Sequence, residues 1–228
     1  MNINYTLKRS KRRRKTISLQ ISSSAEVVVS APYFTTEYEI NNFVREKENW
    51  IWKTIQKQKT APEQNREKSF TTGEFFYYLG SPCPLEVFFQ NDLPPGLVFW
   101  NNRFYLNSPD APAAGKGHFV KWYKTAARKH LTSRVAFLAS DLKLSPCNIR
   151  ITSAQTRWGS CSEKNSLAFS FRLIMAPPEV IDYVIVHELM HIREKNHSSK
   201  FWKLVVEVMP HYKVHRRWLR DNGHRFIL

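Results

Sequence analysis

The sequence predicts an α+β fold whose N-terminal portion is rich in β-strands, and three observations lead to this. Residues 2–31 and 70–107 show the alternation and the β-branched or aromatic enrichment of short strands. From residue 118 onward, several long segments repeat apolar residues at helical intervals. A chain of 228 residues, of which 42% are hydrophobic, can bury the core of one large domain or two small ones. We expect a β-rich portion with one helix over residues 1–110 and a second portion, which holds the candidate site, over residues 111–228.

In the N-terminal portion, the segments NINYTLKR, TISLQIS and EVVVSAP predict a three-stranded β-meander over residues 2–31. One helix is expected from Thr35 or Thr36 to about Lys59, with Thr36 as its cap. Residues 70–107 then predict short antiparallel strands, separated by turns that contain Gly, Pro and Asn. The many aromatic residues here are more typical of a sheet core than of a surface that stacks nucleic-acid bases.

A basic run lies between the first two predicted strands. From Lys8 to Lys15, seven of the eight residues are Lys or Arg. The run is a candidate for binding nucleic acid, and it is equally well interpreted as a solvated turn and sheet edge that its charges keep from pairing.

The second portion opens with residues 108–117, whose Pro, Ala and Gly content favours a hinge or linker. A long amphipathic helix with a basic outer face follows. Residues 148–177 then predict two strands joined by a turn at residues 162–165. This hairpin either holds an extended substrate by backbone hydrogen bonds or packs Trp158 and Phe169 beneath the next helix, and both can be true.

The helix expected from Pro177 onward carries His187-Glu188-Leu189-Met190-His191, an H-E-x-x-H arrangement. Residues four apart in a helix are separated by about 40° around the axis and about 6 Å along it, so the two histidines share a face on which one ion can bind both imidazoles. Glu188 projects beside them, where a carboxylate can take a proton from a metal-bound water. The helix is apolar on nearly every side and belongs in a core, where these polar groups need a partner such as a divalent cation.

A third ligand is needed, and His197 is the best candidate by its spacing. It follows His191 by six residues, after a helix break that we expect near Asn196. Histidines at these spacings are typical of the longer zinc-protease motif H-E-x-x-H-x-x-G-x-x-H. This chain departs from that motif, because Glu194 occupies the position of its glycine. Glu207, on the following helix, is the alternative third ligand, and Glu194 is a weaker one.

Charge and cysteine content bear on partners and compartment. The net charge of +16 predicts attraction to nucleic acid or other polyanions through a basic surface. No apolar run is long enough to span a bilayer, and the N-terminus lacks the apolar stretch of a signal peptide, so we expect no membrane partner. Three cysteines at unrelated spacings suit free thiols in a reducing cytoplasm.

The segments TRWGSCS and FRLIMAPPEVIDYVIVHELMHIREKNHSSKFW resemble the YgjP-like metallopeptidases, relatives of the SprT and WLM zincins. The resemblance runs nearly end to end, and these two segments carry most of it. It implies a zincin-like α+β domain in which His187, His191 and His197 bind zinc and Glu188 is the catalytic carboxylate.

Two positions depart from the pattern of that family. Asn165 stands where glycine is usual, and asparagine can adopt the same turn. Ser170 stands where asparagine is usual, so we expect the local hydrogen bonds near the site to differ.

These residues predict a zinc-dependent metallopeptidase with one Zn²⁺ ion, a water at the fourth position and Glu188 as general base, acting on proteins or peptides. Two alternatives stay open: a metal-dependent hydrolase of nucleotide polyphosphates, and a nucleic-acid-associated protein whose metal is structural. A second group that stabilises the oxyanion is also expected. The candidates for this group are Arg157, His211, Tyr212 and His215.

Overall fold

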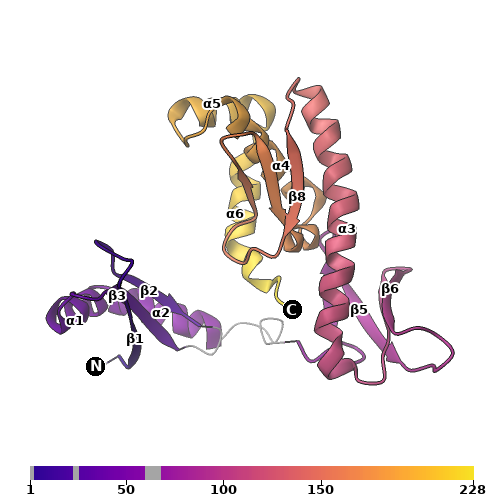
Figure 1. Ribbon diagram of the computed structural model, residues 1–228, viewed down its shortest axis with the longest axis horizontal. Coiled ribbons are helices and arrows are strands. Elements are labelled where there is room, and N and C mark those ends of the chain that lie inside the picture. The colour runs from indigo at the N-terminus through magenta and orange to yellow at the C-terminus, as the bar shows by residue number, and fades with distance from the viewer. Residues whose placement is uncertain (1–2, 23–25, 60–67) are drawn as a thin grey trace. The chain divides into compact units, whose positions relative to one another are not determined.

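The computed structural model describes residues 3–22, 26–59 and 68–228, and the chain forms two compact units, Met1–Arg66 and Glu67–Leu228 (Figure 1). The sequence placed the division between residues 110 and 111, so the structure moves residues 67–110 into the second unit. The cause is a shared core, because Phe76 and Phe104 from the strand region pack with Phe119 and Tyr123 from the following helix.

The first unit contains a three-stranded sheet. Its strands are β1 (Tyr5–Ser10), β2 (Ser18–Ile21) and β3 (Val27–Pro32). The order is β1-β3-β2, with β1 parallel and β2 antiparallel to β3, so the predicted meander is wrong. β3 takes the centre because it is the most apolar of the three, and it buries Val27, Val29 and Ala31.

Two helices complete the first unit where one was predicted. They are α1 (Glu37–Glu46) and α2 (Glu48–Lys59), and the break falls at Lys47. Thr36 caps α1 as expected: its Oγ1 accepts from the backbone N–H of Glu39 at 3.3 Å, while the carboxylate of Glu39 accepts from the backbone N–H of Thr36 at 2.8 Å.

The basic run occupies the end of β1 and the connection to β2. Arg9 donates to the carbonyl oxygens of Tyr33 and Thr35, at 2.8 and 2.6 Å, and Arg13 donates to the hydroxyl of Ser18 at 2.8 Å. Arg9 and Arg13 therefore form hydrogen bonds within the first unit, which supports a structural role for part of the run.

The second unit begins with a four-stranded sheet. Its strands are β4 (Phe75–Tyr78), β5 (Ser81–Phe88), β6 (Gly96–Trp100) and β7 (Arg103–Asn107), in the order β4-β5-β7-β6. The β5–β7 pair is parallel, so the expectation of antiparallel pairing is wrong there. Tight two-residue turns join β4 to β5 and β6 to β7; the second of them is at Asn101 and Asn102, with φ of 47° and 57°.

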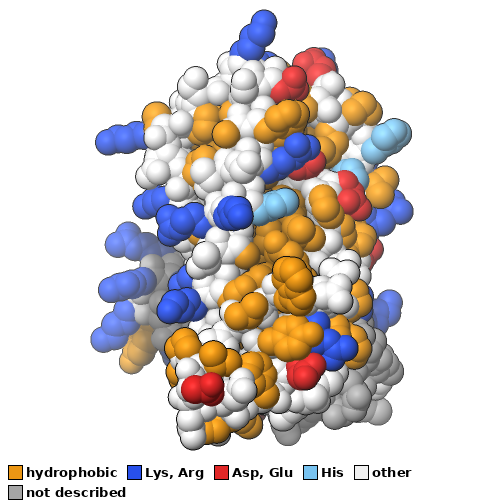
Figure 2. All heavy atoms as spheres, turned by 90° about the vertical axis from the view of Figure 1, so that its right-hand side faces the viewer, with side chains coloured by type: hydrophobic (Ala, Val, Ile, Leu, Met, Phe, Trp, Pro, Cys, Tyr) orange, Lys and Arg blue, Asp and Glu red, His pale blue; other side chains and the backbone are white. Residues whose placement is uncertain are grey.

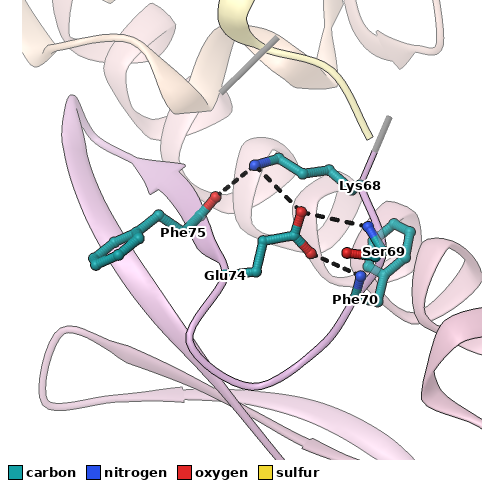
Figure 3. Close-up of polar contacts among 5 residues, drawn as sticks. All are labelled: Lys68, Ser69, Phe70, Glu74 and Phe75. Carbon is teal, nitrogen blue, oxygen red and sulfur yellow. Dashed lines mark hydrogen bonds and ion pairs between the residues drawn. The ribbon is translucent and has the colours of Figure 1, made fainter. Parts of the chain in front are cut away.

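The segment that leads into β4 is held by one acidic side chain (Figure 3). The carboxylate of Glu74 accepts from the backbone N–H groups of Ser69 and Phe70, at 3.3 and 2.7 Å. It also lies 3.7 Å from the ammonium of Lys68, which donates to the carbonyl of Phe75 at 2.9 Å. These contacts place Phe70 against the core of the second unit.

The long helix α3 (Ala111–Asp141) begins where a hinge was predicted, and that prediction is wrong. Asp110 caps it by accepting from the backbone N–H of Ala113 at 3.4 Å. Gly115 is in its second turn for a steric reason: a Cβ there would lie 2.5 Å from Cβ of Phe70. The predicted basic outer face of α3 is present. Figure 2, which views the molecule from the right-hand side of Figure 1, shows lysine and arginine side chains among exposed hydrophobic ones.

A three-stranded sheet and three helices complete the second unit. They are β8 (Asn148–Thr152), β9 (Gly159–Cys161), β10 (Ser166–Ser170), α4 (Pro178–Arg193), α5 (Ser199–Val208) and α6 (Tyr212–Asn222). The strand order is β8-β10-β9, and the predicted turn at residues 162–165 joins β9 to β10. In Figure 1, α4 lies between α3 and α6.

Two further observations concern membrane spans and cysteines. Within the described ranges, no helix has both the length and the apolar character needed to cross a membrane. Cys83, Cys147 and Cys161 are all unpaired.

The two glycines at the start of α3 allow a matched test of its packing. Gly115→Ala should lower the free energy of unfolding by about 1–3 kcal/mol, because the new methyl group collides with Phe70. In Gly117→Ala, the new methyl group meets no atom within 4 Å. This substitution should raise the free energy of unfolding by about 0.5–1 kcal/mol, since alanine favours the helix. Urea denaturation followed by tryptophan fluorescence measures both, and equal effects of the two substitutions would contradict the steric explanation.

Candidate metal centre

The helix α4 is fixed from both sides before it reaches the candidate site. Pro177 and Pro178 start it as expected, and the tight turn at Leu79 and Gly80 donates hydrogen bonds to the backbone just before that start. On its other side, both carboxylate oxygens of Asp182 accept from Arg134 of α3, at 2.6 and 2.7 Å.

The structure brings His187, His191 and His197 together. The first two come from successive turns of α4, and the third comes from the segment between α4 and α5. Nε2 of His197 lies 2.9 Å from Nε2 of His187 and 3.2 Å from Nε2 of His191, and among the residues described these three form a group that could hold one metal ion. Ligand nitrogens on a tetrahedral zinc ion, at 2.0–2.1 Å from it, lie roughly 3.3 Å apart. The spacing of the imidazoles therefore fits one ion.

The other two candidates for the third ligand lie outside this group. Glu207 is exposed on α5. The carboxylate of Glu194 lies 3.8 Å from Lys200, while its backbone carbonyl faces Nδ1 of His191 at 3.0 Å. An Nδ1–H that donates to this carbonyl leaves Nε2 of His191 with its lone pair free for a metal.

The position of that carbonyl depends on where α4 ends. We expected the helix to break near Asn196, but it ends at Arg193, and Glu194 is already extended, with φ of −140° and ψ of 110°. No sequence pattern pointed to this role for the carbonyl of Glu194, because a backbone group has no side-chain signature. The early break also leaves the chain in position to return His197 toward α4.

Burial favours the neutral form of two of the imidazoles, those of His187 and His191. Burial is the main reason that the pKa of His187 falls to about 3, and the positive charges of His191, His197 and Arg216 lower it further. Burial also lowers the pKa of His191. Nδ1 of His187 is buried and finds no hydrogen-bond partner among the described residues. Neutral imidazoles are the form that binds metals.

Glu188 lies beneath β9. The residue is only 6% exposed, and a Cβ on Gly159 would lie 2.6 Å from Cγ and from Oε1 of Glu188. Burial raises the pKa of Glu188 to about 8, and Arg157 opposes that rise. The missing side chain at Gly159 is what lets the strand and the carboxylate approach so closely.

A cleft of about 310 Å³ opens beside His187 and Glu188. Tyr183, Arg216 and Arg220 line it, and our sequence reasoning missed all three. Tyr183 lies one turn before His187 on the same helix, so helical spacing alone would have found it. Arg216 and Arg220 arrive on α6 through tertiary packing, for which the sequence carries no local signal.

None of the four residues predicted to stabilise an oxyanion lines this cleft. Tyr212 is buried and stacks on Trp202, with ring centroids 5.1 Å apart. His215 stacks on Tyr183 at 6.4 Å. Arg157 is exposed and acts on Glu188 through its charge.

The two departures from the family pattern are accommodated locally. Asn165 adopts the left-handed conformation, with φ of 58°, and its Oδ1 accepts from Lys195 at 2.6 Å. The hydroxyl of Ser170 donates to the carbonyl of Ala154 at 2.8 Å.

The metal content of variants tests which residues bind. We expect about one zinc ion per wild-type chain and a content well below that in His197→Ala, because two imidazoles hold the ion weakly. Glu207→Ala is the matched control and should keep the full content, since this carboxylate is exposed and outside the histidine group. Plasma emission spectrometry after exhaustive dialysis measures both, and unchanged zinc in His197→Ala would exclude this residue as the third ligand.

Comparisons with known proteins identify the family of this chain. The family model described as YgjP-like, metallopeptidase domain, matches residues 15–222. Among solved structures, the metallopeptidase zymogen of Pyrococcus abyssi abylysin is similar at 20% identity, over 40% of this chain and 93% of that one, with a TM-score of 0.37. None of the curated proteins that were compared matches significantly. Because the family model spans most of the chain, this α+β, zincin-like protein belongs to the YgjP-like metallopeptidase family.

Proposed function

We propose that the protein is a zinc-dependent metallopeptidase that hydrolyses peptide bonds, with His187, His191 and His197 as the ligands of one ion and Glu188 as general base. The observation that carries the proposal is the convergence of the three Nε2 atoms, two of them 2.9 and 3.2 Å from the third. Family membership supports the reaction class.

The residues divide the chemistry between them. A zinc ion held by the three imidazoles would supply a Lewis acid that acidifies water and polarises the scissile carbonyl. Glu188 follows His187 directly and lines the same cleft, so its carboxylate accepts the proton of the attacking water and delivers it to the leaving amine. The carbonyl of Glu194 orients His191, and Gly159 leaves the space in which Glu188 sits.

The strand β9 favours a peptide as the substrate. It is an edge strand, paired with β10 on one side, and its Gly159 touches the catalytic carboxylate. An extended peptide that adds to the free edge of β9 would run past Glu188, held by backbone hydrogen bonds that suit many sequences. A nucleotide has no equivalent row of backbone groups with which to pair.

Replacing the general base separates catalysis from metal binding. Glu188→Gln should lower kcat on an unfolded protein or a peptide by about 10²- to 10⁴-fold, because the amide cannot accept the proton. Its zinc content should match the wild type, since Glu188 is not a ligand. Release of phosphate from nucleoside triphosphates, lost in this variant and without proteolysis by the wild type, would contradict the proposal and favour a nucleotide polyphosphate hydrolase.

Adding a methyl group at the neighbouring strand tests how Glu188 is positioned. Gly159→Ala should lower kcat by about 100-fold or more, because the methyl group occupies the place of the carboxylate and displaces it. Zinc content should stay complete. Gly117→Ala, in the same unit and away from the site, is the control, and full activity of Gly159→Ala with bound zinc would show that the close approach is dispensable.

A further inference from the structure

The cleft beside the metal centre has apolar walls and a cationic rim. Its uncharged walls come from four side chains: Trp158 just before β9, Tyr183 and Val184 of α4, and Leu219 of α6. The rim carries Arg216 and Arg220, one turn apart on α6. The acidic residue among the lining side chains is Glu188, which the proposed reaction already uses.

The two arginines differ in their own partners. Nε of Arg220 lies 3.0 Å from the carboxylate of its neighbour Asp221, so part of its charge is compensated. The guanidinium of Arg216 lies over the ring of Trp202, with Cζ 5.0 Å from the centroid. In the part of the chain that the structure describes, Arg216 has no acidic partner within salt-bridge distance.

Trp202 ties Arg216 to the metal centre. The same indole also stacks with the ring of His197, at 5.7 Å between centroids. Arg216 is close enough to the site for its charge to lower the pKa of His187 and of Tyr183, in both cases as a smaller contribution than the burial of the group. The guanidinium thus stands at the edge of the candidate metal centre, and none of its N–H groups is hydrogen-bonded to a residue that the structure describes.

We propose that Arg216 binds a carboxylate of the peptide substrate, so that this peptidase prefers substrates with an acidic side chain or a free C-terminus in the cleft. The inference rests on the proposed function and names the substrate class of the same site. A planar guanidinium matches a carboxylate through two parallel hydrogen bonds. The apolar walls strengthen this pairing, because they exclude water from one side of it.

Matched peptides test the preference. The peptides of one series differ only at one position near the cleaved bond, which carries Glu, Gln or Lys. Further series move this position along the peptide on both sides of the bond, and kcat/KM is measured for every peptide with zinc-loaded enzyme. The wild type should prefer the best Glu peptide over its Gln counterpart by about tenfold or more, as a charge-assisted pair implies. Arg216→Gln should bring that ratio close to one, and Arg216→Glu should turn the preference toward Lys. Arg217→Gln, an exposed neighbour that does not line the cleft, should keep the wild-type ratio.

A second arm identifies the source of the carboxylate. Each peptide is compared as its free acid and as its C-terminal amide. A preference that amidation removes assigns the terminal carboxylate, whereas a preference that survives amidation assigns the acidic side chain. Equal cleavage of Glu, Gln and amidated peptides by the wild type would overturn the inference. An equal loss on all peptides in Arg216→Gln would do the same, because it would place Arg216 at the scissile group or in the fold.

Binding without turnover keeps this inference separable from the proposed reaction. The same peptides are titrated against zinc-loaded Glu188→Gln protein by tryptophan fluorescence, with Glu188→Gln/Arg216→Gln as the comparison. Tighter binding of the acidic peptide, by about tenfold and only when Arg216 is present, supports the inference even if catalysis is absent. Absence of metal-dependent cleavage of every peptide, together with such binding, would overturn the peptidase reaction alone. Equal binding of acidic and neutral peptides would overturn the role of Arg216 alone.

Discussion

The structure depends on how it accommodates the polar side chains of a buried, mostly apolar helix. α4 is enclosed on nearly every side, yet it carries two histidines and a glutamate in five consecutive residues. Burial in such a place costs several kcal/mol for each group that lacks a partner. His197, the carbonyl of Glu194 and the gap at Gly159 are the arrangements that accommodate the three side chains. The surroundings of α4 are therefore organised around its polar face as much as around its apolar ones.

The rest of the second unit fixes the helix that carries these groups. The turn at Leu79 and Gly80 docks on the residues before α4 so closely that a Cβ at Gly80 would lie 2.9 Å from Cα of Pro177. Arg134 holds Asp182 from α3, and the phenylalanine cluster around Phe76 and Phe119 joins α3 to the four-stranded sheet. A catalytic constellation needs support of this kind, because small displacements of reacting groups are costly. This explains why the strands that the sequence assigned to a separate portion belong to the catalytic unit.

The sequence predicted what is local and missed what is tertiary. His187, Glu188, His191 and His197 span eleven residues, so helical geometry and ligand spacing were enough to place them together. Strand order in both N-terminal sheets was beyond reach, because alternation predicts strands but not which neighbours they pair with. Gly115 misled the prediction of α3: its helix-breaking character suggested a hinge, whereas its missing side chain makes room for Phe70. The sequence could not predict that Arg216 lines the cleft, because this position depends on the packing of α6 beside α4.

The charges around Glu188 couple metal binding to the ionisation of its carboxyl group. Burial raises the pKa of this carboxyl to about 8 even though the charge of Arg157 lowers it, and a protonated acid cannot accept a proton. Positive charge nearby favours the carboxylate, and Arg157 already contributes in this direction. A divalent cation on the adjacent imidazoles would supply more, because a bound ion is the largest local charge in such a site. A cation at the histidine group and the ionised form of Glu188 are therefore expected to stabilise each other.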